Sequence, residues 1–301
     1  MKIAITGGSG FLGGYVVESL KNSNYTPIIF SRKKLNGQEL KCELRITDYS
    51  EDSLIDQLSG INAVVHLAAK RGSQEKIHEF HNNELLTQNL YEACYKLGIT
   101  NIVYASTISV YSNEKLLPWS EKQLPAPNSM YGVSKLANEH IGNIYSAKKG
   151  LFIKNLRLAH LFGFKEKNNY MINRFMRQAF HHEQLVINGK SVAKREFLYA
   201  KDAAKAIVCA LKKKEISGTF NVGSGEAFTN YEVAKIINVV FKNKGNLLVK
   251  NPEGDEGIYS SYMDNSKSKK VLMFSPDYTF FSALTEIYTL MRGLDDVPLW
   301  Y

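Results

Sequence analysis

The fold is decided by Thr6-Gly7-Gly8-Ser9-Gly10-Phe11-Leu12-Gly13, a glycine-rich stretch that follows the apolar run Ile3-Ala4-Ile5 and opens an apolar helical segment. Glycines at this spacing let the chain turn tightly, approach a phosphate with its backbone and pack a helix closely on a strand. Unpaired N–H groups and the helix dipole at the start of that helix attract anionic oxygens. The stretch therefore predicts a strand–turn–helix unit that binds the pyrophosphate of a dinucleotide.

The composition is that of an ordinary globular protein. The chain has 301 residues, 44% hydrophobic and 22% charged, enough for one large or two smaller domains. Met1 and Lys2 lead directly into an expected core strand, so we expect no signal peptide, and no apolar run approaches the roughly 20 residues of a membrane span. Cys42, Cys94 and Cys209 lie outside any CxxC spacing, which favours reduced thiols. We expect a cytoplasmic protein with no membrane partner.

The net charge of +9, with a pI near 9.2, raises the question of nucleic-acid binding. The lysines are scattered, and the densest basic runs, 32–34 and 212–214, are short. No basic stripe is interleaved with aromatic residues, so we expect solvated surface and no nucleic-acid partner. A modest attraction for anionic small molecules is the better functional interpretation.

The first half of the chain alternates short apolar runs with helical periodicity. We expect strands at 2–6, 26–30, 41–45, 62–67, 101–105 and 151–157, and helices near 11–21, 51–59, 80–97 and 131–148. Such alternation is typical of α/β proteins with a Rossmann-type, doubly wound parallel sheet covered on both faces. The glycine turn then places a dinucleotide at the carboxyl edge of the sheet.

Beyond about residue 163 the regular alternation of strands and helices ends. We expect a helix at 168–180, a short strand pair that turns at Asn188-Gly189, a helix at 202–213, a strand at 218–222 and helices at 230–241 and 281–292. This pattern predicts two interleaved domains. The NAD(P)-binding Rossmann domain would take 1–163 plus about 202–225, and a smaller α/β substrate-binding domain would take 164–201 and 226–301.

Tyr131-Gly132-Val133-Ser134-Lys135 is a candidate catalytic motif, because residues four apart share one helix face. A nearby ammonium favours the phenolate and lowers the tyrosine pKa toward the working pH, as a general acid/base for a hydroxyl requires. An amphipathic helix with a surface tyrosine and lysine gives the same short pattern.

Ser106 and Thr107 follow the apolar run 102–105, at the end of a strand expected in the centre of the sheet. That end faces the same crevice as the glycine stretch. A hydroxyl there could bind a sugar oxygen and hold it against Tyr131. Ordinary turn chemistry after a strand also favours Ser and Thr at these positions.

Together these motifs resemble the extended short-chain dehydrogenase/reductase family, which includes the nucleotide-sugar epimerases and dehydratases. The resemblance covers nearly the whole chain. Its further segments are TD at 47–48, HLAA at 66–69, Asn83 with Thr87 and Asn89, RLAHLFG at 157–163, KREFLYAKDAA at 194–204, FNVGSG at 220–225 and MDNSKS at 263–268. Within the family, the pattern is most similar to UDP-N-acetylglucosamine and UDP-glucose 4-epimerases of bacteria.

The resemblance implies a role for each matching position. Tyr131 would be the acid/base, Lys135 would hold the nicotinamide ribose and lower the tyrosine pKa, and Thr107 would polarise the reacting oxygen. Ser106 matches a supporting hydroxyl, Asp48 would contact the adenine, and Asn83 would steady the helix that carries the lysine. The other implied cofactor contacts are Gly7, Ser9, Gly10, Phe11, Leu12, Gly13, Leu67, Ala68 and Ala69.

On the substrate side, the resemblance implies three contacts. Arg195 matches an arginine that meets the nucleotide diphosphate, for which a cationic fork is suited. Asn169 matches a substrate-contacting asparagine. His160 stands where the family usually has an asparagine near the substrate phosphate; an imidazole could serve instead, and a satisfied core histidine is the alternative.

Ser31-Arg32 departs from the pattern of NAD enzymes, which carry an acidic residue after the second strand for the adenine-ribose 2′-hydroxyl. An acid would repel a 2′-phosphate, whereas a serine with an arginine would favour one. NADP is therefore a candidate cofactor beside NAD. A solvent-facing basic loop explains the same residues.

Two other departures bear on the reaction. The 4,6-dehydratases carry an Asp–Glu pair after the threonine, and Ile108 and Ser109 cannot replace it, which disfavours that reaction. The arginine often found just before the MDNSK-like segment is replaced by residues 259–262, so diphosphate binding would be weaker or would come from other residues. The histidines show no metal-ligand spacing, and we expect no metal.

The leading hypothesis is an NAD(P)-dependent epimerase that oxidises C4 of a nucleotide-diphosphate sugar transiently to a 4-keto sugar. The alternative enzyme is an NADPH-dependent reductase of a 4-keto nucleotide sugar. A non-catalytic dinucleotide sensor or RNA-associated protein is the alternative from another class, although it would have no need of the Thr–Tyr–Lys set. By the resemblance, the helices near 80–97 and 131–148 would pair two subunits into a homodimer.

Overall fold

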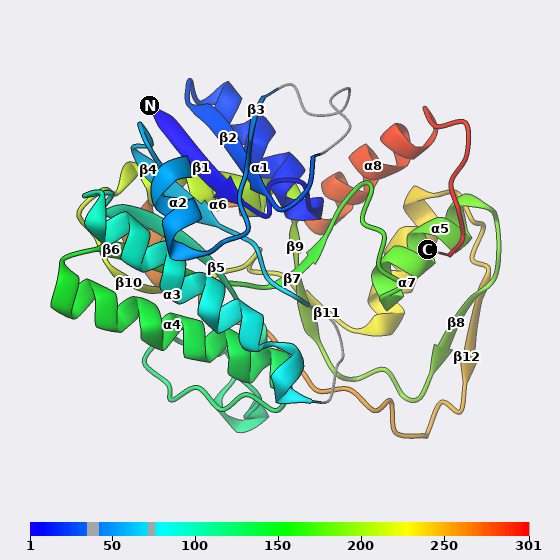
Figure 1. The fold of residues 1–301 in the computed structure, drawn as a ribbon. Helices are drawn as coiled ribbons and strands as arrows, with labels where there is room; N and C mark the ends of the chain where they lie inside the picture. The colour runs from blue at the N-terminus through cyan, green and yellow to red at the C-terminus, as the bar shows by residue number, and fades with distance from the viewer. Residues whose placement is uncertain (35–41, 72–75, 301) are drawn as a thin grey trace.

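A seven-stranded sheet forms the larger part of the protein, whose computed structural model describes residues 1–34, 42–71 and 76–300 (Figure 1). Its strands run parallel in the order β10-β6-β5-β4-β1-β2-β3. They are β1 (Lys2–Thr6), β2 (Thr26–Ser31), β3 (Glu43–Ile46), β4 (Ala63–His66), β5 (Asn101–Thr107), β6 (Phe152–Leu158) and β10 (Gly218–Val222). The expected doubly wound parallel sheet is confirmed. Position 41, where the third strand was expected to begin, lies outside the described residues.

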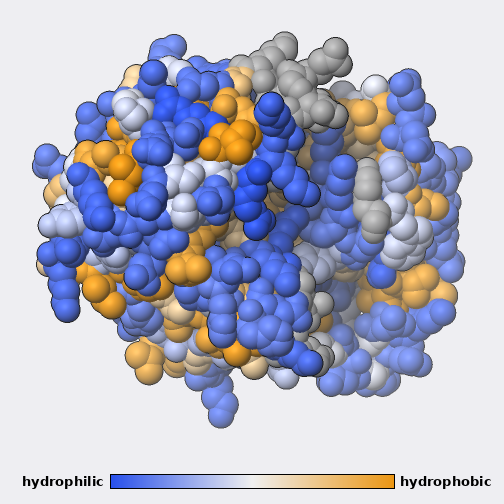
Figure 2. All heavy atoms as spheres, in the orientation of Figure 1, coloured by the Kyte–Doolittle hydropathy of each residue, from blue (hydrophilic) through white to orange (hydrophobic). Residues whose placement is uncertain are grey.

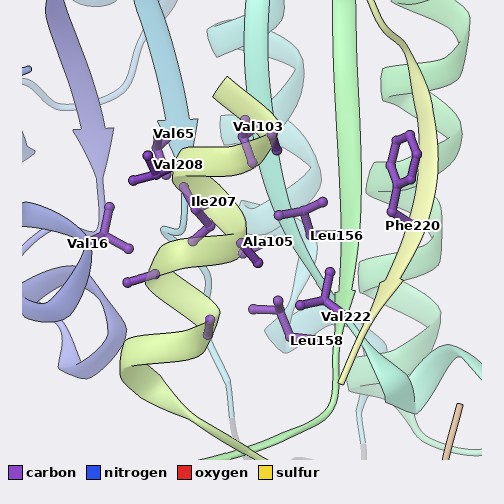
Figure 3. Close-up of a cluster of buried hydrophobic side chains, with 14 of the residues drawn as sticks. Val16, Val65, Val103, Ala105, Leu156, Leu158, Ile207, Val208, Phe220 and Val222 are labelled. Carbon is purple, nitrogen blue, oxygen red and sulfur yellow. The ribbon is translucent and has the colours of Figure 1, made fainter. Parts of the chain in front are cut away.

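Helices cover both faces of this sheet (Figure 1). The helices α1 (Phe11–Asn22) and α6 (Ala200–Lys212) pack on one face, and α2 (Glu51–Gln57), α3 (His81–Lys96) and α4 (Met130–Lys149) pack on the other. Successive residues of a strand serve opposite cores. Val103 packs with the α1/α6 side, as Figure 3 shows, whereas its neighbours Ile102 and Tyr104 pack with the α3/α4 side. This explains why the central strands read as continuous apolar runs.

Local signals set the ends of the helices that matter for function. The Ser129 hydroxyl accepts a hydrogen bond from Gly132 N at 3.1 Å and caps α4, while Gly150, at φ +69°, ends it in the left-handed region. Thr229 and Glu232 form a capping box at the start of α7 (Asn230–Val240). The helices expected at 131–148 and 230–241 are therefore confirmed, with ends within one residue of those expected.

The C-terminal half builds a second apolar core around α5 (Met171–Phe180), α7 and α8 (Phe280–Met291) (Figure 1). A three-stranded sheet, β11-β9-β7, and a two-stranded sheet, β12-β8, accompany it. These strands are β7 (His160–Phe162), β8 (Leu185–Asn188), β9 (Arg195–Tyr199), β11 (Ala227–Phe228) and β12 (Leu247–Lys250). Short 3₁₀ helices at Ile77–Glu79, Ile108–Val110 and Glu114–Leu116 and a π-helical turn at Ser268–Leu272 lie in connections.

The expected strand pair turning at Asn188-Gly189 is wrong. β8 pairs in parallel with β12, and Gly189 N donates to Lys250 O at 2.9 Å. β9 pairs instead with β7 and β11. Pairing with a segment about sixty residues further along the chain leaves no local signal, whereas the Asn-Gly sequence itself favours a hairpin turn. The helix expected from 168 begins at Met171, after Tyr170 as its N-cap residue.

Candidate functional site

A cleft of about 1620 Å³ separates the carboxyl edge of the large sheet from the C-terminal half, and Figure 2 shows the surface hollowed between them. We call its two sides the sheet wall and the opposite wall. The sheet wall comprises the ends of the strands β1 to β5, the connections that follow them and the starts of α1, α3 and α4. The opposite wall comprises His160, the connection after β7, α5 and β9. The predicted site residues that line the cleft are Gly7, Ser9, Gly10, Phe11, Leu12, Gly13, Ser31, Arg32, Asp48, Leu67, Ala68, Ala69, Asn83, Ser106, Thr107, Tyr131, Lys135, His160 and Arg195. Asn169 is absent from this lining.

The glycine stretch forms a tight backbone cradle between β1 and α1. Gly7 has φ +72°, and a Cβ there would lie 2.7 Å from Ala68 N at the end of β4. A Cβ at Gly13 would lie 2.5 Å from Gly7 O. The N-cap residue of α1, Gly10, has no side chain to cap the first turn. The first residues of α1, Phe11, Leu12 and Gly13, line the cleft, and the unpaired N–H groups of a first helical turn suit a pyrophosphate.

Tyr131 and Lys135 lie on one face of α4, beside the end of β5. Lys135 Nζ donates to Ala105 O at 2.7 Å and lies 5.9 Å from the centre of the Tyr131 ring. Burial lowers the pKa of Lys135 to about 7, against the attraction of Glu139. Burial also raises the pKa of Tyr131 to about 12, and the cation that opposes this rise is Arg71. Desolvation thus outweighs the nearby charge of Arg71, and the expected lowering of the Tyr131 pKa by Lys135 stays a prediction.

The hydroxyls at the end of β5 point to different partners. Thr107 Oγ1 accepts from Ser109 N at 3.1 Å and lines the cleft near α4. Ser106 donates its hydroxyl hydrogen to Glu139, which is buried beside it. Glu139 also forms an ion pair with Arg157, in which Arg157 Nη2 lies 2.6 Å from Glu139 Oε2. This buried pair fixes the Glu139 carboxylate one helical turn beyond Lys135, where its charge favours the ammonium form of the lysine.

Two further predicted residues, Asn83 and Asp48, form hydrogen bonds that stabilise connecting segments at the sheet wall. Asn83 Nδ2 donates to Ser134 Oγ at 3.3 Å, and Asn83 Oδ1 accepts from Lys70 N at 2.7 Å. The side chain thus links the connection after β4 to α4, the helix that carries Lys135. Asp48 accepts from the Ser50 hydroxyl at 2.7 Å and from Ser50 N at 2.8 Å, and these hydrogen bonds lower its pKa.

The opposite wall brings together two of the three predicted substrate residues. Arg195 Nη2 donates to Asn230 Oδ1 at 2.7 Å, and among the described residues no partner reaches its buried Nε. His160 Nε2 lies 2.9 Å from Ser261 Oγ, and burial with the charge of Arg195 lowers the pKa of this histidine to about 4. The imidazole is therefore neutral at physiological pH.

Asn169, the third predicted substrate residue, contacts Arg177. Its Oδ1 accepts from Arg177 Nη2 at 2.7 Å, and the residue is exposed outside the cleft lining. The neighbouring residues Asn168 and Tyr170 line the cleft instead. The substrate contact expected of Asn169 stays a prediction.

Sequence reasoning missed Arg71 and Glu166. Arg71 lines the cleft after β4 and makes a two-pronged ion pair with Glu166, in the connection between β7 and α5. The two residues lie 95 positions apart, so no spacing in the sequence links them. Arg71 follows the HLAA segment (66–69) after Lys70. This position after a strand of the sheet was the available signal for a cation at the carboxyl edge.

Metal ligands and membrane spans were also sought in residues 1–34, 42–71 and 76–300. Within these ranges no group of three or more histidine, cysteine, aspartate or glutamate side chains could hold a metal ion. In the same part of the chain, no helix is both long enough and apolar enough to cross a membrane.

Residues 3–223 match the model of the NAD dependent epimerase/dehydratase family, and the chain belongs to this family. It is 31% identical to an uncharacterized UDP-glucose epimerase, YtcB, of Bacillus subtilis, over 98% of this chain and 99% of that protein. The solved structure of UDP-N-acetylglucosamine 4-epimerase from Bacillus cereus is 66% identical, with TM-score 0.94 and 100% of both chains covered. UDP-glucuronic acid 4-epimerase from Bacillus cereus, solved with UDP-glucuronic acid and NAD, is 26% identical, with TM-score 0.83 and 97% and 99% covered.

Proposed function

We propose that the protein is an NAD-dependent 4-epimerase of a UDP-sugar, with UDP-N-acetylglucosamine as the first candidate substrate. The observation that carries this proposal is the placement of Tyr131, Lys135 and Thr107 on the sheet wall, in one cleft with the glycine cradle. The 66% identity to UDP-N-acetylglucosamine 4-epimerase from Bacillus cereus supports the choice of sugar.

The cofactor fits the sheet wall. The cradle between β1 and α1 admits no side chain at Gly7 or Gly13, and it offers the helix N–H groups to a pyrophosphate. Lys135 and Asn83 would hold the ribose side of the cofactor, and Asp48 would lie near the adenine. When bound, the nicotinamide supplies the acceptor and donor of the hydride at C4.

Tyr131 would take the proton of the C4 hydroxyl and later return it to the same oxygen. Thr107 would donate a hydrogen bond to that oxygen as charge develops on it. With the cofactor held on the sheet wall, the nicotinamide would accept the hydride of C4 and would return it to the opposite face after the 4-keto sugar has rotated. Proton and hydride are both restored, so the turnover needs no external oxidant or reductant.

The opposite wall would bind the nucleotide diphosphate. Arg195 presents a guanidinium whose buried Nε has no partner among the described residues. A diphosphate oxygen would supply that missing acceptor. His160, neutral and bonded to Ser261, would add a polar contact in place of the usual asparagine.

An NADPH-dependent reductase of a 4-keto nucleotide sugar is the second candidate, and Arg32 is the residue that favours it. Ser31, Arg32 and Lys33 line the cleft after β2, where a 2′-phosphate would lie.

We further propose a Rossmann domain of 1–163 plus about 202–225, a substrate-binding domain of 164–201 and 226–301, and a homodimer through α3 and α4. The exposed apolar side chains Leu85, Val133 and Ile144 on these helices support the last proposal.

The proposed function is tested by incubating the purified protein with UDP-N-acetylglucosamine and following the C4 configuration by proton NMR. We expect UDP-N-acetylgalactosamine to form to equilibrium without added NADH. Tyr131→Phe should lower the rate by about 10²- to 10⁴-fold, the usual contribution of a general acid/base, with the bound cofactor retained. A near-normal rate in this variant would contradict the assignment.

A further inference from the structure

Glu196 is a buried carboxylate behind the opposite wall of the cleft. Its neighbours in β9, Arg195 and Phe197, line the cleft, and the alternation of side chains along a strand turns Glu196 away from it. The residue is 1% exposed. Among the residues that the structure describes, no lysine or arginine forms an ion pair with it. Hydrogen bonds therefore hold this side chain in place.

Three N–H donors from two distant segments converge on the carboxylate. Glu196 Oε1 accepts from Gly225 N at 2.8 Å and from Asn265 Nδ2 at 2.9 Å, and Oε2 accepts from Met263 N at 2.9 Å. Because every partner is a donor, the geometry fits an ionised carboxylate, whose oxygens only accept. The space is tight, since a Cβ at Gly223 would lie 2.0 Å from Oε1.

One of the two segments, residues 261–265, supplies the partner of His160. It runs beside β9, where Glu196 N donates to Ser261 O at 2.9 Å and Ser261 N donates to Lys194 O at 2.7 Å. Ser261 Oγ in turn lies 2.9 Å from His160 Nε2. The hydrogen bonds between the carboxylate and the same segment therefore fix the position of the hydroxyl that His160 contacts.

The other segment supplies the partner of Arg195. From Gly225 the chain leads into β11, where Phe228 pairs with Arg195, and then to Asn230, the first residue of α7. Asn230 Oδ1 accepts from Arg195 Nη2 at 2.7 Å. A single carboxylate thus anchors both segments whose side chains bond to the two candidate substrate residues of this wall.

We propose that Glu196 is a positioning residue for substrate binding: its buried carboxylate holds the two segments that orient Arg195 and His160 toward the nucleotide diphosphate. This inference rests on the substrate side of the proposed function. Glu196 lies outside the cleft lining and on the wall away from the glycine cradle. Its loss should therefore weaken substrate binding and spare the cofactor.

The first test is Glu196→Gln in the NAD-loaded protein. A carboxamide keeps one acceptor oxygen, but its NH₂ group must then face an N–H donor, so a hydrogen bond is replaced by a repulsion. We expect the Kd of UDP, measured by isothermal titration calorimetry, and the KM for UDP-N-acetylglucosamine to rise about tenfold. The value of kcat should change less, and the bound NAD should be retained.

Asp202→Asn is the matched control. Asp202 is also a 1% exposed carboxylate that accepts from backbone N–H groups of a distant segment, Asp277 N at 2.7 Å and Tyr278 N at 3.3 Å. These three residues lie outside the cleft lining. The control should lose stability in thermal unfolding, as Glu196→Gln should, but it should keep the wild-type Kd for UDP.

Gly223→Ala is a second variant that disturbs the same carboxylate without replacing it. Its Cβ would lie 2.0 Å from Glu196 Oε1, so the carboxylate must move. We expect the Kd of UDP to rise as in Glu196→Gln. This variant decides the question if Glu196→Gln does not fold.

A further readout needs no substrate. In protein with carbon-13-labelled histidine, the Cε1 signal of His160, assigned by its loss in His160→Gln, reports the contact with Ser261. It should shift in Glu196→Gln and stay in place in Asp202→Asn. If the wild type binds no UDP, the proposed function fails, yet this signal still decides whether Glu196 positions His160.

Two results would overturn the inference. A wild-type Kd for UDP and an unmoved His160 signal in Glu196→Gln would mean that the carboxylate only stabilises the fold. A Kd raised equally in Asp202→Asn, or NAD lost together with UDP binding, would mean that reduced stability, and not positioning, weakens the site.

Discussion

The two walls of the cleft differ in how the chain builds them. The predicted residues of the sheet wall lie at or just after the ends of parallel strands or in the first two turns of a helix, and all of them line the cleft. The opposite wall depends on contacts between distant segments, such as Arg195 with Asn230 and His160 with Ser261. If the proposed function holds, the comparison teaches that proton and hydride chemistry would rest on the edge of the sheet, whereas substrate recognition would be assembled from segments that can vary more freely.

A change in the glycine cradle should have the largest effect on the sheet wall. In Gly13→Ala, the new Cβ would lie 2.5 Å from Gly7 O and from two Gly8 atoms, so backbone must shift. We expect a loss of about 1–3 kcal/mol in the free energy of unfolding, as for overpacked sites, and loss of bound cofactor. Urea unfolding and the nucleotide content of the purified protein measure both effects.

Gly14→Ala is the matched control, one residue further along the same helix. Nothing lies within 4 Å of a Cβ at Gly14. This variant should keep its cofactor and gain up to about 1 kcal/mol of stability, because alanine favours a helix interior over glycine. If both variants lost the cofactor equally, the cradle would not explain its binding.

A change on the opposite wall should act on substrate binding and leave the chemistry alone. Arg195→Met removes the guanidinium proposed to meet the diphosphate. A hydrogen bond to a charged group is worth about 1.5–3 kcal/mol, so KM for the UDP-sugar should rise about tenfold or more. Steady-state kinetics should show a smaller change in kcat. A fall in kcat at constant KM would place Arg195 in the chemistry and break the division between the walls.

Asn169→Ala serves as the comparison within that wall and should have the smallest effect. Asn169 bonds to Arg177 outside the cleft lining, so its loss should leave KM nearly unchanged. Although its partner is a guanidinium, Asn169 is exposed, so the expected cost is about 0.5–1.5 kcal/mol of stability, below that of a buried hydrogen bond to a charged group. A KM effect as large as that of Arg195→Met would restore the substrate role that the sequence suggested.

The parallel sheet could be predicted because its signals are local. Short apolar runs, helical periodicity and the glycine turn placed six of its seven strands in the first half, and the strand at 218–222 was also expected. The strand β12 and the partner of β8 could not be predicted, because parallel pairing over long separations depends on the folded chain. The Asn188-Gly189 pair carried a real turn preference, yet tertiary pairing overrode it.

The candidate site followed the same rule. Tyr131 and Lys135 share one helix, so their common face could be predicted from spacing alone. The pKa of Tyr131 could not, since it depends on burial and on Arg71, which come from the whole fold. The Arg71–Glu166 pair was missed for the same reason: its members come from different walls.

The central claim, a UDP-sugar epimerase that keeps one NAD through many turnovers, is tested most directly by denaturing the purified protein and identifying the released nucleotide by mass. An epimerase has no net redox change, so the account predicts close to one NAD per chain. In that case Arg32 is a surface residue of the cleft edge. Protein that releases no nucleotide, or NADP(H) that washes off before denaturation, would contradict the account and favour the reductase.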